Sequence, residues 1–491
     1  MKTIILIIFS LFSLNIIAAN YNVATDGSGD YTTISQVNSA SFSPGDSIFF
    51  NRGDTWAETF TIPSSGSSGN PIFFGAYGTG ADPIITGSDT RTPVIHVNNN
   101  SYIIIDNITI EHCASDPWHG AIRTGTTSTV GVVIQNCTIQ DNRGSGISLQ
   151  GSSTATSVTI DNCIIQNNGQ FGILISDAFT SGEIKDCQIL SNGGYADTDA
   201  QQFSNIQGNL SNFEIHGNTI YNAAPGTTTK LSESHGIYSS SATTITCNIY
   251  NNTIYGNLAG AGIKARYSVN VYNNLIYNNG YTAISLGGNG TTNAVYNVHH
   301  NITYGSVLGY GSLSVTLKGS GTLDANIYNN TFYKSGDAYN STKEVSISDN
   351  LTSLNVKNNI FYAADGRGGI RIDTTQSNAD IDYNLYWKDT ESGVPNNMYN
   401  GTTYTTLAEW QALGFDTNGV NENPDLVNPT SDFRLQSGSP AIDAGVDVGL
   451  TTVGLPDIGA YEFGTSAPIK LQTDGSNVYY KLTNGKWWGG N

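Results

Sequence analysis

The stretch Ser234–Gly288, SHGIYSSSATTITCNIYNNTIYGNLAGAGIKARYSVNVYNNLIYNNGYTAISLGG, decides the fold of this chain. It holds one unit three times: a strand opening with Gly-Ile or Ala-Ile, a second alternating strand, and an Asn-Asn turn. Alternation places every second side chain on one face of a strand. In the middle unit, Lys264 and Arg266 lie two positions apart on the outward face. Only 12% of the chain is charged, so two cations this close together are unusual here. They are either part of an ordinary solvated surface or part of an active site.

The turn of this unit recurs along most of the chain at spacings of 22 to 34 residues. Its column reads Ile108, Cys137, Cys163, Cys187, Asn218, Asn252, Asn274, Asn301, Asn330, Asn359 and Asn384. A second column, two positions later, reads Ile110, Ile139, Ile165, Ile189, Ile220, Ile254, Ile276, Thr303, Phe332, Phe361 and Tyr386. Eleven units of unequal length in one register indicate a solenoid rather than separate small domains.

Both columns have the same parity, so both point inward. An inward Asn in a stacked turn can bond to the next coil, whereas a buried unpaired amide costs about 1 to 3 kcal/mol. Cys137, Cys163 and Cys187 share the Asn column, and Cys247 has a matching inward parity. We expect these cysteines to be packing residues, and a disulfide between stacked coils remains open.

This pattern resembles the pectin-lyase-like right-handed parallel β-helix family, whose coils have three short strands and an asparagine ladder. The resemblance covers roughly residues 20–463. Residues 433–445 (FRLQSGSPAIDAG) and 457–462 (DIGAYE) also resemble the closing segment of secreted β-helix proteins. The family resemblance implies an all-β fold, a single-stranded right-handed parallel β-helix of about 11 or more coils with end caps. It also implies a protein that acts on polysaccharides.

The chain divides into five predicted segments. Residues 1–19 read as a secretory signal peptide, because Lys2 precedes an apolar run that ends in Ala18 and Ala19. Residues 20–100 form the N-terminal cap and first coils, in which 27–35 and 45–56 read as strand, turn, strand. Residues 101–387 are the repeats. Residues 388–463 are the C-terminal capping segment with one helix over 405–413, and 464–491 form a short trailing hairpin or tail.

The net charge of −19 argues against nucleic acid or an anionic membrane surface as a partner. After the signal segment, no apolar run is long enough to span a bilayer. We therefore expect a secreted, extracellular or periplasmic, monomeric protein without membrane insertion, whose partner is a polysaccharide. An anionic polysaccharide would need a local cationic patch or a bound cation.

The first strand of each coil supplies the candidate site, since the resemblance implies that this sheet forms the floor of a polysaccharide groove. The outward column is expected to be Arg123, Ser148, Leu174, Gln207, Tyr238, Lys264, Ser285, Thr316, Ser346 and Arg371. The next outward column is expected to be Gly125, Gln150, Ser176, Asn209, Ser240, Arg266, Gly287, Lys318, Ser348 and Asp373. Parallel strands lie about 4.8 Å apart. We predict a compact patch with substrate-binding residues Asn209, Ser240, Gln207 and Lys318.

The two longest coils lie just before this patch, at 31 and 34 residues. Their insertions contain Asp197, Asp199, Glu233 and His235, and insertions in solenoids commonly build a binding wall. Carboxylate oxygens suit Ca²⁺, so Asp197, Asp199 and Glu233 are candidate calcium ligands. Asp is also a frequent loop residue, which leaves the calcium hypothesis open.

The predicted activity is that of a polysaccharide lyase on a uronic-acid glycan. Lys264 would be the base, because a neighbouring cation depresses the pKa of a lysine. Arg266 would neutralise the sugar carboxylate, and Tyr238 or His235 would donate the proton. Several lyases of the resembled fold use Lys and Arg with calcium, although their two cations usually lie on different coils.

Other readings remain open from the sequence. A C5-epimerase would use the same proton abstraction, and a glycoside hydrolase could use Glu233 with Asp197 or Asp199. A non-catalytic glycan-binding or adhesion protein would leave Lys264 and Arg266 as a solvated strand face, and His235 could simply cap a turn. An outward aromatic column could stack on itself or bind sugar rings; it reads Tyr221, Tyr255, Tyr277, Tyr304, Tyr333, Tyr362 and Trp387.

Overall fold

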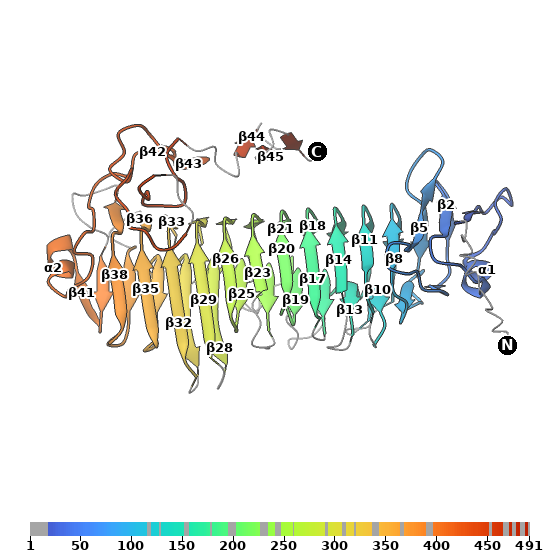
Figure 1. Ribbon diagram of the computed structural model, residues 1–491, viewed down its shortest axis with the longest axis horizontal. Coiled ribbons are helices and arrows are strands. Elements are labelled where there is room, and N and C mark those ends of the chain that lie inside the picture. Colours follow the sequence, from blue (N-terminus) through green and yellow to red (C-terminus); the bar gives the residue numbers. More distant parts are fainter. Residues whose placement is uncertain are drawn as a thin grey trace, which may run out of the picture.

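The computed structural model of the chain is an elongated β-solenoid (Figure 1). It describes residues 18–464, apart from 115–118, 127–128, 152–156, 177–178, 195–202, 226–233, 241–246, 259, 290–292, 307–310, 319–320, 336–342, 364–367, 389–395 and 451–453. Beyond residue 464 it describes three strands. Among these residues, no helix combines the length and apolar character needed to cross a membrane.

Each turn of the chain adds one strand to each of three parallel sheets, here named sheets A, B and C. Sheet A contains β1 (Asn20–Val23), β2 (Ser47–Asn51), β5 (Ile72–Tyr77), β8 (Ile103–Asp106), β11 (Val132–Gln135), β14 (Ser157–Asp161), β17 (Ser181–Lys185), β20 (Phe213–His216), β23 (Cys247–Tyr250), β26 (Val269–Tyr272), β29 (Ala294–His299), β32 (Leu323–Tyr328), β35 (Ser353–Lys357) and β38 (Ala379–Asp382).

Sheet B contains β3 (Thr55–Trp56), β6 (Ile84–Thr86), β9 (Thr109–Glu111), β12 (Thr138–Gln140), β15 (Ile164–Gln166), β18 (Gln188–Leu190), β21 (Thr219–Tyr221), β24 (Thr253–Tyr255), β27 (Leu275–Tyr277), β30 (Ile302–Tyr304), β33 (Thr331–Tyr333), β36 (Ile360–Ala363) and β39 (Leu385–Lys388).

Sheet C contains β4 (Phe60–Thr61), β7 (Ile95–Asn98), β10 (Gly120–Thr124), β13 (Ser145–Leu149), β16 (Ile173–Ile175), β19 (Ile206–Gly208), β22 (Ile237–Ser239), β25 (Ile263–Ala265), β28 (Ile284–Asn289), β31 (Leu313–Lys318), β34 (Val345–Ile347), β37 (Ile370–Ile372), β40 (Asn397–Tyr399) and the antiparallel β41 (Thr402–Tyr404). The predicted all-β solenoid with three strands per coil is therefore confirmed.

The turn between sheets A and B carries the predicted asparagine ladder. From Asn218 to Asn384, each side-chain amide donates to the Oδ1 atom of the next coil's Asn at 2.9–3.0 Å. The residue before each ladder Asn adopts a left-handed backbone, as Asn251 and Asn273 do with φ of 54° and 55°. Asn tolerates this conformation better than most residues, which explains the Asn-Asn pairs.

The ladder ends at a buried acid in the C-terminal cap. The two Oδ atoms of Asp416 accept hydrogen bonds from Asn384, Tyr386 and Trp410. Trp410 belongs to α2 (Leu407–Gln411), the helix predicted at this end, and Thr406 is its N-cap. The cap thus supplies the partner that the last Asn would otherwise lack.

A second buried amide ladder was not recognised in the sequence. Asn142, Asn168 and Asn192 each donate to the next member, ending at Asn205, at 2.8 Å. Asn257 donates to Asn279 in the same way. These residues lie in the turn between sheets B and C, and Asn142, Asn168, Asn192, Asn257 and Asn279 each follow the A–B turn position of their coil by five residues, a regular signal that was available in the sequence.

All five cysteines are free and buried. Cys163, Cys187 and Asn218 lie in one column, since the Cys163 amide donates to the Cys187 sulfur and the Cys187 amide donates to Asn218. The prediction that the cysteines are packing residues is confirmed, and the open possibility of a disulfide between coils is not realised.

Both ends of the chain differ in part from expectation. The first strand-like segment, predicted over 27–35, ends in helix α1 (Ile34–Ser39) instead. Thr33 and Gln36 make a reciprocal capping box there, a signal that outweighs the alternation of this short segment. The trailing hairpin is a three-stranded antiparallel sheet of β44 (Leu471–Thr473), β45 (Val478–Lys481) and β46 (Trp487–Gly489).

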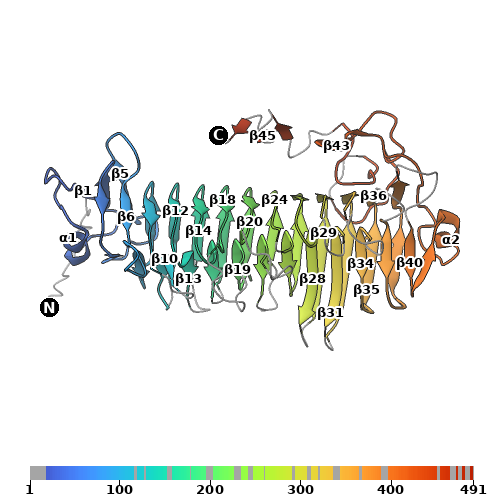
Figure 2. The same ribbon diagram turned by 180° about the vertical axis from the view of Figure 1, so that it is seen from behind.

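The C-terminal segment covers part of the outward aromatic column on sheet B (Figure 2). The Tyr221, Tyr255, Tyr277 and Tyr304 rings stack at centroid distances of 4.8–4.9 Å. Phe433 on β43 (Asp432–Leu435), which pairs with β42 (Leu426–Asn428), packs against Tyr304 and Tyr333. This contact supports the self-stacking reading of the column for its later coils.

Replacing one inward ladder residue should destabilise the coil strongly. Asn301 is fully buried, donates to Asn330 and to the Val271 carbonyl, and accepts from Asn274. We expect Asn301→Ala to lower the free energy of unfolding by about 2 kcal/mol or more, because several buried groups lose their partners. Urea unfolding measures the change. Val295→Thr, at a 40% exposed position on the outward face of the same coil, is the control, and an equal loss in both variants would contradict the prediction.

Candidate functional site

The outer face of sheet C carries the predicted column almost as expected. Paired strands place in one column His96, Arg123, Ser148, Leu174, Gln207, Tyr238, Lys264, Ser285, Ser314, Ser346 and Arg371. The prediction of Thr316 is wrong by two residues, since Ser314 is the partner of Ser285. Ser314 and Thr316 both face outward, so the alternation of the strand could not show which of them pairs with Ser285.

This correction moves Lys318 away from the predicted patch. Lys318 pairs with Asn289, two residues beyond the pairing of Thr316 with Gly287. Because strands β28 and β31 are six residues long, their far ends extend beyond the three-residue strands β22 and β25. The strand position of Lys318 therefore does not place it in the column of Arg266.

Two cations lie over one aromatic ring at the centre of the column. The Lys264 Nζ atom is 5.3 Å and the Arg266 Cζ atom is 5.2 Å from the centroid of the Tyr238 ring. Both distances are within the range of cation–π attraction, about 6 Å. Tyr238 is only 3% exposed, whereas Lys264 and Arg266 are half-buried. We call these three residues the cationic patch.

Among the described residues, Arg266 of the cationic patch has no acidic partner. No carboxylate of the described residues forms an ion pair with the Arg266 guanidinium, although six other described Lys and Arg residues do pair with Asp or Glu. A cation that is attracted by an aromatic face keeps its hydrogen-bond donors available for an anion. This arrangement can therefore bind a carboxylate from a ligand.

His235 lies beneath the patch as a neutral ring. It is 1% exposed and contacts Tyr238 edge to face, with centroids 5.2 Å apart. Its Nδ1 atom accepts a hydrogen bond from the Ala261 amide at 2.9 Å, which places the proton of the neutral ring on Nε2. Burial, with Lys264 and Arg266 nearby, holds the pKa of His235 well below its usual value. Its bond to Ala261 fits the capping reading of this residue.

The other predicted substrate-binding residues surround Tyr238. Gln207 is its neighbour in the column and accepts a hydrogen bond from the Ser204 hydroxyl at 3.1 Å. Asn209 is buried, and its Oδ1 atom accepts the Ser211 amide at 3.2 Å, which closes a local turn. Ser240 is half-buried and directly follows β22. Gln207 and Ser240 are therefore placed beside the patch, while Asn209 already serves the backbone.

The predicted calcium ligands Asp197, Asp199 and Glu233 lie outside the described residues. Within the described part of the chain, no group of three or more His, Cys, Asp or Glu residues is arranged to hold a metal ion. Calcium binding thus stays a prediction.

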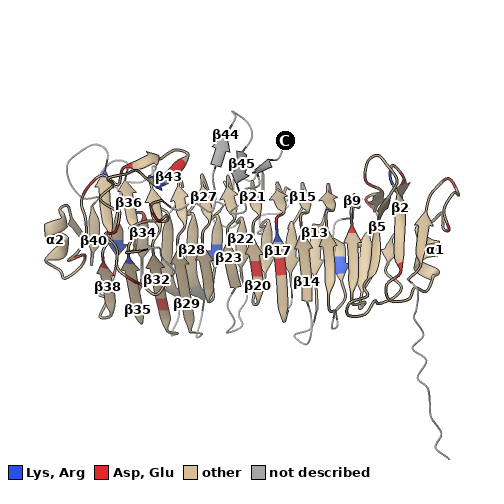
Figure 3. Cartoon of the chain, turned by 45° about the horizontal axis from the view of Figure 1, so that its top comes forward, with Lys and Arg blue, Asp and Glu red and all other residues tan. Residues whose placement is uncertain are grey.

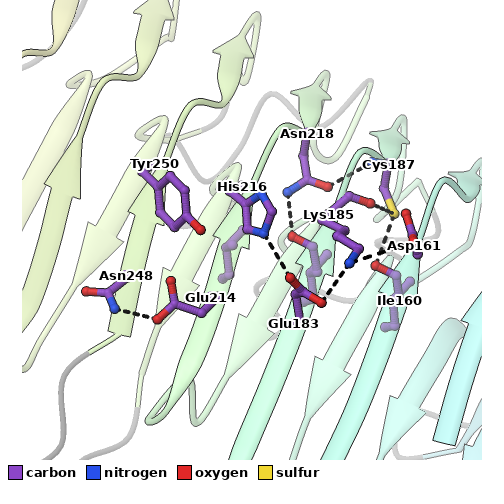
Figure 4. Close-up of polar contacts among 12 residues, drawn as sticks. Ile160, Asp161, Glu183, Lys185, Cys187, Glu214, His216, Asn218, Asn248 and Tyr250 are labelled. Carbon is purple, nitrogen blue, oxygen red and sulfur yellow. Dashed lines mark hydrogen bonds and ion pairs between the residues drawn. The ribbon is translucent and has the colours of Figure 1, made fainter. Parts of the chain in front are cut away.

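One polar cluster was missed in the sequence. Asp161, Glu183, Lys185, Glu214 and His216 lie together on the outer face of sheet A (Figures 3 and 4). The available signal was a change of residue type within one column. Where later coils carry Asn248 and Asn270, two successive earlier coils carry Glu183 and Glu214.

The neutral state of His235 gives a testable pH dependence. The unfolded chain binds a proton at His235 below pH of about 6.5, whereas the folded chain does not, so stability falls as pH decreases through that value. We expect His235→Gln to reduce this slope by up to about 1.4 kcal/mol per pH unit. Urea unfolding at pH 7, 6 and 5 measures it. His112→Gln, whose parent side chain is 47% exposed, is the control, and equal slopes in wild type and His235→Gln would refute the prediction.

Comparison with known proteins agrees with this architecture. Residues 23–220 match the family model described as the right handed beta helix region. No curated protein sequence matches the chain.

Among solved structures, the chain is similar to pectate lyase Pel9A, with 16% identity over 91% of this chain and 97% of that chain, and a TM-score of 0.39. It is similar to XylC in complex with xylose, with 12% identity, coverage of 94% and 89%, and a TM-score of 0.48. An alginate lyase from Paenibacillus sp. str. FPU-7 has 16% identity, coverage of 63% and 98%, and a TM-score of 0.35. The match to the family model and the three parallel sheets confirm, at the level of the fold, the resemblance seen in the sequence, and the chain is a right-handed parallel β-helix protein.

Proposed function

We propose that this protein is a secreted polysaccharide lyase that cleaves an acidic, uronic-acid glycan by β-elimination on the outer face of sheet C. One observation carries the proposal: Lys264 and Arg266 are both held over the ring of Tyr238. The net charge of −19 repels an anionic polymer. A local positive patch would supply the attraction that such a polymer needs in order to bind.

The reaction assigns one role to each member of the patch. The C5 proton of a uronate is weakly acidic, so Arg266 first neutralises the adjacent carboxylate. Lys264 then removes the C5 proton, and the electron pair forms the C4–C5 double bond as the C4–O4 bond breaks. A proton passes to the departing O4 atom, and Tyr238 is the candidate donor.

The choice of Tyr238 over His235 follows from protonation. His235 has a pKa well below its usual value, so at neutral pH it could donate only from a neutral imidazole, a weaker acid than a phenol. The Nε2–H of His235 is buried without a hydrogen-bond partner among the described residues, so the role assigned to His235 is packing against the Tyr238 ring. Gln207 and Ser240, beside Tyr238, are available to sugar hydroxyls.

Three alternatives remain as outcomes of the experiment. An epimerase would remove the same proton and return it to the other face. A hydrolase using Glu233 with Asp197 or Asp199 would release reducing ends without a double bond. A non-catalytic glycan-binding protein would bind without change. The proposal also includes cleavage after Ala19 on secretion and a calcium ion at Asp197, Asp199 and Glu233.

Removal of the base should abolish elimination. We expect wild-type protein, incubated with a panel of uronic-acid polymers, to raise the ultraviolet absorbance of the unsaturated product. Lys264→Ala should lower kcat by about 10² to 10⁴-fold, the usual contribution of a general base. Arg266→Ala should also lower kcat/KM, since it loses carboxylate neutralisation. Lys357→Ala is the control, because Lys357 lies on sheet A and pairs with Asp380 at 2.6 Å.

The outcomes against this proposal are distinct. Absorbance growth that survives Lys264→Ala would remove Lys264 as the base. Reducing ends without absorbance would indicate hydrolysis, and proton exchange at C5 without cleavage would indicate an epimerase. Binding without any chemical change would favour the adhesive reading.

The calcium part of the proposal has its own readout. We expect dialysis against a chelator to lower substrate affinity or turnover, and added Ca²⁺ to restore it, because a bound cation offsets carboxylate charge. Activity that is unchanged after chelation would contradict a calcium requirement while leaving the roles of Lys264 and Arg266 in place.

A further inference from the structure

The outer face of sheet A carries a regular column of amides. Asn270, Asn297, Asn326 and Asn355 each donate from Nδ2 to the Oδ1 atom of the preceding Asn, beginning at Asn248, at 2.7–2.8 Å. The neighbouring column stacks the rings of His216, Tyr250, Tyr272 and His299 at 4.7–5.0 Å. This face therefore repeats one self-satisfied arrangement from coil to coil.

The arrangement breaks at β20 and β17. Asn248 is in register with Glu214, and Glu214 with Glu183, so two carboxylates follow the amides in the same column (Figure 4). Their strands lie about 4.8 Å apart, and like charges directly opposite on a sheet destabilise it. An amide at either position would continue the ladder. A departure from the local rule, on an otherwise regular surface, is expected where a residue serves function rather than stability.

Glu183 is held as a carboxylate by two donors. Lys185 Nζ lies 2.9 Å from its Oε2 atom, and His216 Nε2 lies 3.1 Å from its Oε1 atom. Burial alone would raise the pKa of Glu183, but these hydrogen bonds outweigh it and hold the pKa below its usual value. Glu214 accepts from the Asn248 amide. Each carboxylate retains further lone pairs for a ligand.

Both carboxylates line an open depression of about 570 Å³. Small residues, among them Gly131, Ser157 and Ser181, line it together with Glu183, Glu214 and Asn248. Its volume is in the range of small-ligand sites, about 300 to 1,000 Å³. Its polar lining comprises the Glu183 and Glu214 carboxylates, the Asn212 and Asn248 amides, and the hydroxyls of Ser157, Thr159, Thr180 and Ser181.

We infer that this depression is a second saccharide-binding site, which takes a neutral sugar unit. Paired sugar hydroxyls are donors that match adjacent carboxylate and amide oxygens, and they carry no charge to be repelled by Glu183 and Glu214. A uronate would meet two negative groups here, in contrast to the cationic patch on sheet C. The two faces therefore recognise sugars of different charge, and the sheet A site does not depend on the lyase proposal.

The inference predicts that binding and stability change in opposite directions. Glu214→Gln removes the like-charge pair and offers an amide to Asn248, so it should raise the melting temperature while weakening saccharide binding at least tenfold. Glu183→Gln should weaken binding likewise. Asn326→Ala, in the same column four coils from Glu214, should lower the melting temperature and leave binding unchanged.

The experiment is calorimetric titration of the full chain with cellohexaose, xylohexaose and mannohexaose, and with an oligogalacturonate as the charged probe. We expect at least one neutral hexasaccharide to bind the wild-type protein. Its binding should be lost in both Glu183→Gln and Glu214→Gln. Melting curves of the same samples show that the variants are folded. The inference is overturned if no neutral hexasaccharide binds, if both Glu variants bind as wild type does, or if the oligogalacturonate competes for the same site. Because no elimination is measured, failure of the lyase proposal would leave this result unaffected.

Discussion

The structure depends on one requirement, which is that a buried side-chain amide must find partners. In the turn between sheets A and B, each Asn from Asn218 to Asn359 donates to the Asn that the next coil presents at the same height, as Asn274 does to Asn301 and Asn301 to Asn330. The ladder therefore ties the vertical register of the coils to a polar interaction with defined geometry. Apolar packing alone, with Ile above Ile, would tolerate slippage more readily.

That register is what gives the outer faces their chemistry. Once coils stack at a fixed height, each outward position becomes a column, and neighbours in a column touch although they are more than twenty residues apart in sequence. Tyr rings form a stack on sheet B, amides and rings form parallel columns on sheet A, and Tyr238 and Lys264 become neighbours on sheet C. Insertions in the turns change loop length without changing the register of the strands.

The two polar sites use this geometry with opposite charge. On sheet C, Tyr238 draws two cations over one ring in an acidic protein. On sheet A, two carboxylates interrupt a neutral ladder, and Lys185 and His216 both contact Glu183. Both sites cost stability relative to the surrounding pattern, since like charges are placed on adjacent or alternate positions. The ladders and the continuous core supply the stability that tolerates them.

The sequence by itself determined the solenoid, the inward Asn and Ile columns, the packing role of the cysteines and most of the sheet C column, because each of these follows from a repeat and a parity. It also singled out Lys264 and Arg266, since charge is scarce. Only the tertiary structure decided that Ser314 rather than Thr316 continues the column, because parity does not distinguish positions two residues apart. It also showed that Asn142, Asn168 and Asn192 form a second ladder, because a regular spacing alone does not show which side chains bond to each other. The burial of His235 and the meeting of Glu183 with Glu214 over a depression likewise required coordinates, because exposure and ion pairing depend on what neighbouring coils place around a residue.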